Sequence, residues 1–218
     1  MKHAVVDLSQ ATPVRAARVT NRTLAKQRTR ERVLDAARRM FGERGFDSAT
    51  IRDIAGAADL STGAVFANFA DKAELFDAVM AADYETAARR MQAARVEAGG
   101  RVGETLTAMF SAAYAFHLEQ LPLVQASLAH TWSRDEAAAL FNKASVMRVL
   151  ESLEEVLQAG VDSGELTPSV DVPMLAEMLW DAYLANYRLA VFERYTLDDL
   201  TARVRVQATT MLCGFVRG

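Results

Sequence analysis

Residues 50–69 read TIRDIAGAADLSTGAVFANF, and their spacing is the clearest structural signal in the N-terminal part of the chain. Thr50 and Asp53, three residues apart, form a capping-box pattern at the start of a short helix. A turn at Asp59 and Leu60 follows, and Ser61 then begins another short helix. Two short helices joined by a turn of three or four residues are the geometry that places one helix in the major groove of DNA. The stretch therefore predicts a helix-turn-helix.

Helical patterns continue on both sides of this stretch. Apolar residues recur at helical spacing from Thr23 to Gly45, and Gly45 is a natural left-handed cap. Asp71 and Glu74 predict a further capping box, at the start of a long helix that ends near Glu97. Capping residues, prolines and glycines then bound five more helical segments, at 103–118, 122–131, 134–162, 172–193 and 197–216. We therefore expect an all-α fold of about nine helices, in which a small three-helix head joins a larger bundle.

Composition narrows the class of protein. Hydrophobic residues make up 51% of the chain and charged residues 24%, which is typical of a globular protein. No stretch of about 18 residues is both apolar and uncharged, and the N-terminus lacks a signal peptide, so we expect a cytoplasmic protein without a membrane span. The single cysteine, Cys213, excludes an internal disulfide and a cysteine-cluster metal site, and we expect it to be buried. The sequence contains no catalytic or phosphate-binding motif, so we expect neither an enzyme nor a cofactor.

Charge is unevenly distributed along the chain. Residues 1–50 carry eleven Lys and Arg against five Asp and Glu, whereas the remaining residues carry fourteen against twenty-three. A polyanion such as DNA is drawn to the basic end. Residues 1–22 lack helical periodicity and contain Pro13, so they form either a flexible basic arm that follows phosphates or a passive solvated tail.

Residues 28–80 resemble the DNA-binding domain of the TetR family of repressors. The matching positions are capping, packing and turn residues: Thr50, Ile51, Ile54, Ala55, Ala58, Ser61, Gly63, Val65, Phe69 and Lys72. Three positions depart from the family pattern, and one of them is Asn68, where the family commonly has an aromatic residue or histidine. Asp59 replaces the usual glycine of the turn, and aspartate tolerates a left-handed conformation better than most residues, so we expect the turn to survive. Phe66 replaces the usual tyrosine and offers no hydroxyl to a phosphate.

The resemblance implies a set of DNA-contacting residues. Thr50 and Lys72 would bind phosphates, and Arg52 would contact a phosphate or the edge of a guanine, unless it is a solvated surface arginine. The outward face of the second short helix is poor in hydrogen-bonding groups. Thr62, the amide of Asn68 and apolar contacts with thymine methyl groups would supply the remaining recognition, together with DNA shape. The predicted set is Thr50, Arg52, Ser61, Thr62, Gly63, Ala64, Phe66, Ala67, Asn68 and Lys72.

Two further sites are expected in the larger bundle. An effector pocket would use aromatic and polarizable side chains, each of which has plain core packing as its alternative: Phe110, Tyr114, His117, His130, Trp132, Phe141, Met147, Trp180, Tyr183 and Tyr187. The resemblance implies dimerisation through the last two helices, whose apolar stripes could instead form an intramolecular core. These stripes contain Leu175, Met178, Leu179, Ala182, Leu200, Val204, Met211, Leu212 and Phe215.

Three parts are therefore predicted: a basic arm (1–22), a DNA-binding domain (23–70), and a linker helix with an effector-binding and dimerisation domain (71–218). The resemblance implies a homodimeric repressor that binds a near-palindromic operator and is released by a small, mainly apolar ligand. Two alternatives stay open. One is a transcriptional activator, and the other is a helical dimeric adaptor or ligand-binding protein without sequence-specific DNA binding.

Overall fold

The computed structural model describes residues 21–131 and 136–216, and nine α-helices account for most of them. The basic arm predicted at the N-terminus lies almost entirely outside the described residues. The helices are α1 (Asn21–Ser48), α2 (Ile51–Ala57), α3 (Thr62–Phe66), α4 (Lys72–Ala98), α5 (Val102–Leu118), α6 (Leu121–Thr131), α7 (Glu136–Asp162), α8 (Val172–Glu193) and α9 (Leu197–Leu212). The predicted all-α architecture is confirmed.

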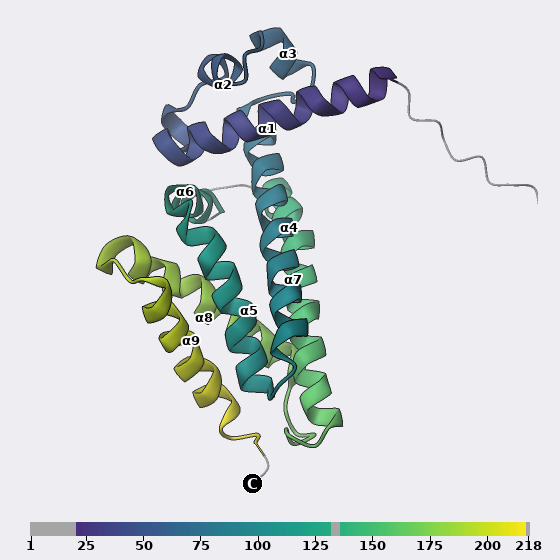
Figure 1. Ribbon diagram of the computed structural model, residues 1–218, viewed down its shortest axis with the longest axis vertical. Coiled ribbons are helices and arrows are strands. Elements are labelled where there is room, and N and C mark those ends of the chain that lie inside the picture. The colour runs from purple at the N-terminus through teal and green to yellow at the C-terminus, as the bar shows by residue number, and fades with distance from the viewer. Residues whose placement is uncertain (1–20, 132–135, 217–218) are drawn as a thin grey trace, which may run out of the picture.

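The first three helices form a head at one end of the molecule (Figure 1). Thr50 and Asp53 make the predicted capping box: Thr50 Oγ1 accepts from Asp53 N, and Asp53 Oδ2 accepts from Thr50 N, both at 3.2 Å. Ser61 caps α3 by accepting from Ala64 N at 3.2 Å. Asp59 adopts a left-handed conformation with φ 53°, so the turn survives without glycine. The predicted helix-turn-helix is confirmed.

A small apolar core holds the head together. Phe41 on α1 packs edge-on against Phe76 on α4, with ring centroids 5.1 Å apart. Val65 and Phe69, predicted as the buried positions of the reading helix and its end, are 0% and 2% exposed. This packing fixes which face of α3 turns outward, because the opposite face is anchored to α1 and α4.

The link between head and bundle is α4. Figure 1 shows this helix leaving the head and running along the bundle, where α5 and α7 pack against it. Its first turns contribute Leu75, Phe76 and Val79 to the core of the head, and its later turns contribute Met91 to the core of the bundle. Both apolar cores therefore share one helix, so a displacement of α4 in the bundle reaches the head.

Two expectations about the C-terminal region are wrong. The last helix ends at Leu212 rather than at residue 216, because the chain then turns and pairs Val216 with Leu166 in an isolated bridge. Cys213 is exposed rather than buried, since it lies just beyond the helix end on its solvent side. Within residues 21–131 and 136–216, no helix has the length and apolar character that crossing a membrane requires.

Candidate DNA-binding head and effector cavity

The residues predicted to contact DNA form an outward face of α2 and α3. Arg52, Thr62 and Gly63 are exposed, and the Phe66 ring is 55% exposed although it is a large apolar side chain. Thr50, Ser61 and Ala67 are exposed as well, while Ala64 and Asn68 are half-buried.

Two of the predicted phosphate contacts are engaged within the head. Lys72 Nζ donates to the carbonyls of Phe46, Asp47 and Ala49 at 2.8 Å, 3.2 Å and 3.2 Å, which uses the three donors of an ammonium. The Thr50 hydroxyl donates to Asp53 Oδ2 at 2.6 Å. Lys72 and Thr50 would thus have to give up an internal hydrogen bond in order to donate to a phosphate.

Asn68 is also turned inward. Its Nδ2 donates to the carbonyl of Ala64 at 2.9 Å, and its Oδ1 is buried without a hydrogen-bond partner among the residues that the structure describes. The half-buried amide therefore has one bond committed to its own helix. The expected phosphate contact needs the amide to rotate, because its inward nitrogen cannot reach a backbone outside the head.

Arginines of α1 tie the helix-turn-helix to the rest of the head, a role that sequence reasoning missed. Arg32 Nη2 donates to the carbonyl of Ala58 at 2.6 Å, at the end of α2. Arg30 Nη1 donates to the carbonyl of Asn68 at 2.8 Å, just beyond α3, and its guanidinium lies 4.1 Å from the centre of the Phe69 ring. Cations at these helix C-terminal ends are favoured by the helix dipole. Helical spacing identifies these arginines as polar but does not reveal their partners, because the partners are 26 to 38 residues away.

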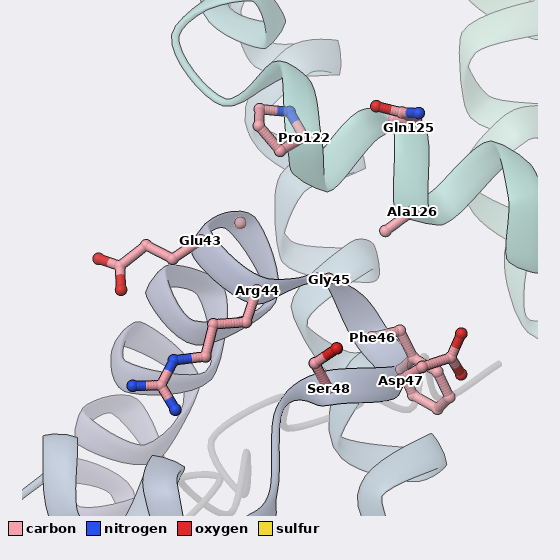
Figure 2. A pocket seen from close by; sticks show the side chains of 10 residues that line it. Glu43, Arg44, Gly45, Phe46, Asp47, Ser48, Pro122, Gln125 and Ala126 are labelled. Atoms are coloured by element: carbon pink, nitrogen blue, oxygen red, sulfur yellow. The ribbon is translucent and has the colours of Figure 1, made fainter.

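A cleft of about 500 Å³ separates the end of α1 from α6. Figure 2 shows Pro122, Gln125 and Ala126 of α6 facing the segment from Glu43 to Ser48 across it. Gly45 lies in this segment with φ 76° and ψ 169°, a conformation that residues with a Cβ rarely adopt. The cleft between the head and α6 is therefore open to solvent in part. It leaves space for the head to tilt relative to the bundle.

A second, much smaller cavity lies inside the bundle, and we call it the bundle cavity. Its volume is about 20 Å³, which is room for about one water molecule. Residues from α4, α5, α6 and α8 line it: Met80, Asp83, Tyr84, His117, Val124, Ser127, Leu128, Tyr183, Leu184 and Tyr187. Three of these, His117, Tyr183 and Tyr187, belong to the predicted effector pocket. Sequence reasoning missed the α4 wall because it expected the pocket between Gly103 and Phe192, and on α6 it named only His130.

A buried polar cluster forms one wall of the bundle cavity. His117 Nδ1 lies 3.0 Å from the Tyr183 hydroxyl and 2.5 Å from the Tyr187 hydroxyl. Burial, reinforced by the nearby Arg90, lowers the pKa of His117 to about 4, and burial raises the pKa values of both tyrosines. At neutral pH the cluster is therefore uncharged and offers hydroxyl and imidazole groups to a ligand.

Four other predicted pocket residues whose side chains the structure describes do not line the bundle cavity. Phe110 and Trp180 stack on Tyr183 with centroids 5.1 Å and 5.2 Å away, and Tyr114 donates to the carbonyl of Tyr183 at 3.1 Å, so these three are core residues. Met147 on α7 is 47% exposed and therefore faces solvent rather than a cavity. Trp132 and the side chains of His130 and Phe141 lie outside the described residues.

The model of the family described as bacterial regulatory proteins, tetR family, matches residues 33–79, from the middle of α1 into α4. This range contains the whole helix-turn-helix. Residues 33–79 are a TetR-family DNA-binding domain. Through this domain the chain is a helix-turn-helix transcriptional regulator.

Known relatives extend the TetR-family similarity into the bundle. The regulator UidR of Escherichia coli strain K12 is 27% identical over 157 residues, which cover 71% of this chain and 78% of UidR. The repressor KstR2 of Rhodococcus jostii is 26% identical over 162 residues, which cover 73% of this chain and 78% of KstR2. The structure of Bacillus subtilis FadR in complex with stearoyl-CoA has a TM-score of 0.74 at 18% identity, and covers 84% of this chain and 98% of FadR. At that identity the likeness to FadR shows the fold alone.

The stripe predicted to form the TetR-family dimer interface is largely intramolecular. Five of its nine side chains are at most 5% exposed and pack in the bundle core: Leu175, Leu179, Leu200, Val204 and Leu212. Ala182, Met211 and Phe215 are half-buried, and Met178 is 46% exposed. The correction follows from packing, because side chains covered by α5 and by each other cannot also face a second copy.

Proposed function

We propose that this chain is a homodimeric repressor that binds a near-palindromic operator and leaves it when a small, mainly apolar molecule occupies the bundle. One observation carries the proposal: α4 belongs to the core of the head and also lines the bundle cavity. A ligand that enlarges a cavity of about 20 Å³ must move its walls. Because α4 is one of those walls, the head moves with it, and ligand and DNA weaken each other reciprocally.

We propose one function for each of the three predicted parts of the chain. Residues 23–70 bind DNA, residues 71–218 bind the effector and a second copy, and residues 1–22 follow phosphates as a basic arm. Because operator DNA lies in the bacterial cytoplasm, the proposed location of the protein is the cytoplasm. Within the head, the exposed Arg52, Thr62 and Phe66 are the proposed DNA-facing side chains. Arg52 supplies a guanidinium suited to guanine, and Phe66 supplies an apolar surface.

The class of ligand is supported by the cavity and by relatives. Aromatic and aliphatic side chains form most of the cavity wall, which suits an apolar molecule. Bacillus subtilis FadR, which shares the fold of this chain, was solved with stearoyl-CoA, a molecule with a long apolar chain. The term repressor also appears in the name of the relative KstR2. These likenesses support a ligand-released repressor over an activator.

A second copy is proposed to pack on the outer faces of α8 and α9. Met174, Met178 and Phe192 follow one face of α8 and are 53%, 46% and 73% exposed. Val206 on α9 is 64% exposed. Exposed apolar side chains at helical spacing on two neighbouring helices suit a four-helix interface with a symmetry-related copy. This face replaces the buried stripe predicted from the sequence.

The experiment is a gel-shift assay with DNA from upstream of the gene that encodes this chain. We expect retarded complexes whose affinity falls steeply as salt rises, because basic residues displace counterions from phosphates. DNA of the same length from inside the coding region is the control and should bind far more weakly. Equal affinity for both fragments would leave only non-specific binding and would contradict the proposed function.

A further inference from the structure

Asp83 is a buried carboxylate in the wall of the bundle cavity. It lies on α4 and is 2% exposed. The polar groups beside it are uncharged at neutral pH, because burial keeps the pKa of His117 low and the pKa values of Tyr183 and Tyr187 high. Among the described residues that line the cavity, Asp83 alone carries a full charge. The bundle cavity therefore presents one negative group within a largely aromatic wall.

The positive partner of Asp83 comes from the head. Arg38, on α1, donates from Nε to Asp83 Oδ1 at 2.8 Å, and its Nη2 lies 2.6 Å from the same oxygen. Burial raises the pKa of Asp83, and the Arg38 guanidinium opposes that rise. A second carboxylate, Asp35, lies 3.6 Å from Arg38 but is exposed to solvent. The buried charge of Asp83 thus depends on a residue of the DNA-binding head.

The charge of a ligand determines how much free energy is needed to widen the cavity beside Asp83. The α4 and α6 walls both pack against α1, so widening the cavity strains the contact between Asp83 and Arg38. A buried carboxylate that loses its partner is strongly destabilising. A neutral ligand does not offset the free energy that is lost when Asp83 is left without its positive partner. An anionic ligand adds repulsion between its own charge and the Asp83 carboxylate. A cationic ligand removes the cost, because it takes the place of the guanidinium.

We propose that Asp83 is the charge-recognition residue of the bundle cavity, and that the effector is an apolar molecule carrying one amine, amidine or guanidine group. The cationic group displaces Arg38 from Asp83, while the apolar part packs against the rings of Tyr183 and Tyr187. Because Arg38 belongs to α1, its displacement removes one contact that fixes α1 against the middle of α4, so the tilt of the head changes. This inference rests on the proposed ligand-released function and adds the charge of the ligand and the contact that it breaks.

The test compares three probes of the same shape that differ in charge: benzamidinium, benzamide and benzoate. Full-length protein is examined in two ways, by its melting temperature without DNA and by its affinity for a duplex selected by the wild type from a randomised pool. Sodium chloride keeps ionic strength equal, since DNA binding depends on salt. We expect benzamidinium alone to raise Tm, by about 3 °C at ten times its Kd, and to weaken DNA binding by about fivefold or more.

Two variants test whether the response to benzamidinium depends on the Asp83 carboxylate. Asp83→Asn should abolish the response to benzamidinium in both measurements. Asp35→Asn, which removes the exposed carboxylate beside the same arginine, should respond as the wild type does. An equal response to benzamide, an unchanged response in Asp83→Asn, or no response of the wild type to benzamidinium would each overturn the assignment. Failure of the wild type to select any duplex would instead contradict the proposed function, while the melting temperatures would still decide the role of Asp83.

Discussion

His117 Nδ1, on α5, lies 3.0 Å from the hydroxyl oxygen of Tyr183, on α8, and both side chains are buried. This contact joins the two helices at the wall of the bundle cavity. Burial disfavours the imidazolium, which is why the pKa of His117 falls from 6.5 to about 4. The unfolded chain therefore binds a proton at His117 more readily than the folded chain.

This difference predicts a pH dependence of stability. As pH falls from about 6.5 to about 4, the unfolded state takes up a proton that the folded state refuses, so folding loses up to about 3 kcal/mol. The loss is absent above pH 7 and complete below about pH 4. Urea denaturation at pH 7.5 and pH 4.5 measures it, and His117→Gln should show a smaller difference between the two values. An identical difference in both proteins would show that His117 does not titrate in this way.

Gly45 is predicted to be required for the kink in the last turns of α1. Its φ of 76° and ψ of 169° are open to glycine and strained for other residues, so Gly45→Ala should cost about 1–3 kcal/mol of unfolding free energy. Gly42, three residues earlier, is the matched control, because an added Cβ would meet nothing within 4 Å. Gly42→Ala should be neutral or stabilising by up to about 1 kcal/mol, as alanine favours helix. Thermal unfolding of both variants compares them, and equal effects would contradict the role given to Gly45.

Arg52 is predicted to discriminate between bases. Arg52→Ala should weaken binding to the preferred site by about tenfold and relax the preference at one base pair of each half-site. Arg89→Ala removes another exposed arginine, on α4 and away from the reading face, and should leave the preference unchanged. Binding to a series of single-base variants of the site measures the preference. If both variants kept the wild-type preference, Arg52 would be only a surface residue.

The outer faces of α8 and α9 are predicted to hold the dimer together. Val206→Glu places a charge on a side chain that is 64% exposed in the protomer, and should convert the protein to a monomer with much weaker operator binding. Val96→Glu is the matched control, since Val96 is 72% exposed on α4. Light scattering coupled to size-exclusion chromatography gives the mass of each variant. A dimeric Val206→Glu protein would place the interface elsewhere.

Local sequence signals predicted the head well. Thr50, Asp53 and Ser61 mark helix starts through bonds to residues three positions away, so their roles can be recognised from spacing alone. The turn at Asp59 is also a local feature, because aspartate tolerates the left-handed conformation that the turn requires. Family resemblance then supplied the function of the helix-turn-helix, which spacing alone does not establish.

The bundle was harder to predict because its contacts are long-range. Arg38 and Asp83 are 45 residues apart, and nothing in either local pattern indicates that they meet. The pattern of Leu179 and Val204 fits a dimer interface, yet both side chains face the protomer's own core. An apolar stripe at helical spacing predicts burial, but it does not tell whether the same chain or a second copy covers it. The pocket prediction failed at Met147 for the related reason that an aromatic or sulfur-containing side chain need not face a cavity.

Selection of binding sites from a randomised pool of duplex DNA tests whether the chain is a sequence-specific dimeric repressor, because the protein itself chooses the sequence that it binds. We expect the purified chain to enrich a near-palindromic sequence whose two half-sites lie about one helical turn apart, or a multiple of it. Recovery of duplexes with no shared sequence after repeated rounds would contradict sequence-specific binding, because a dimer with two ordered helix-turn-helix domains must prefer some sequences over others.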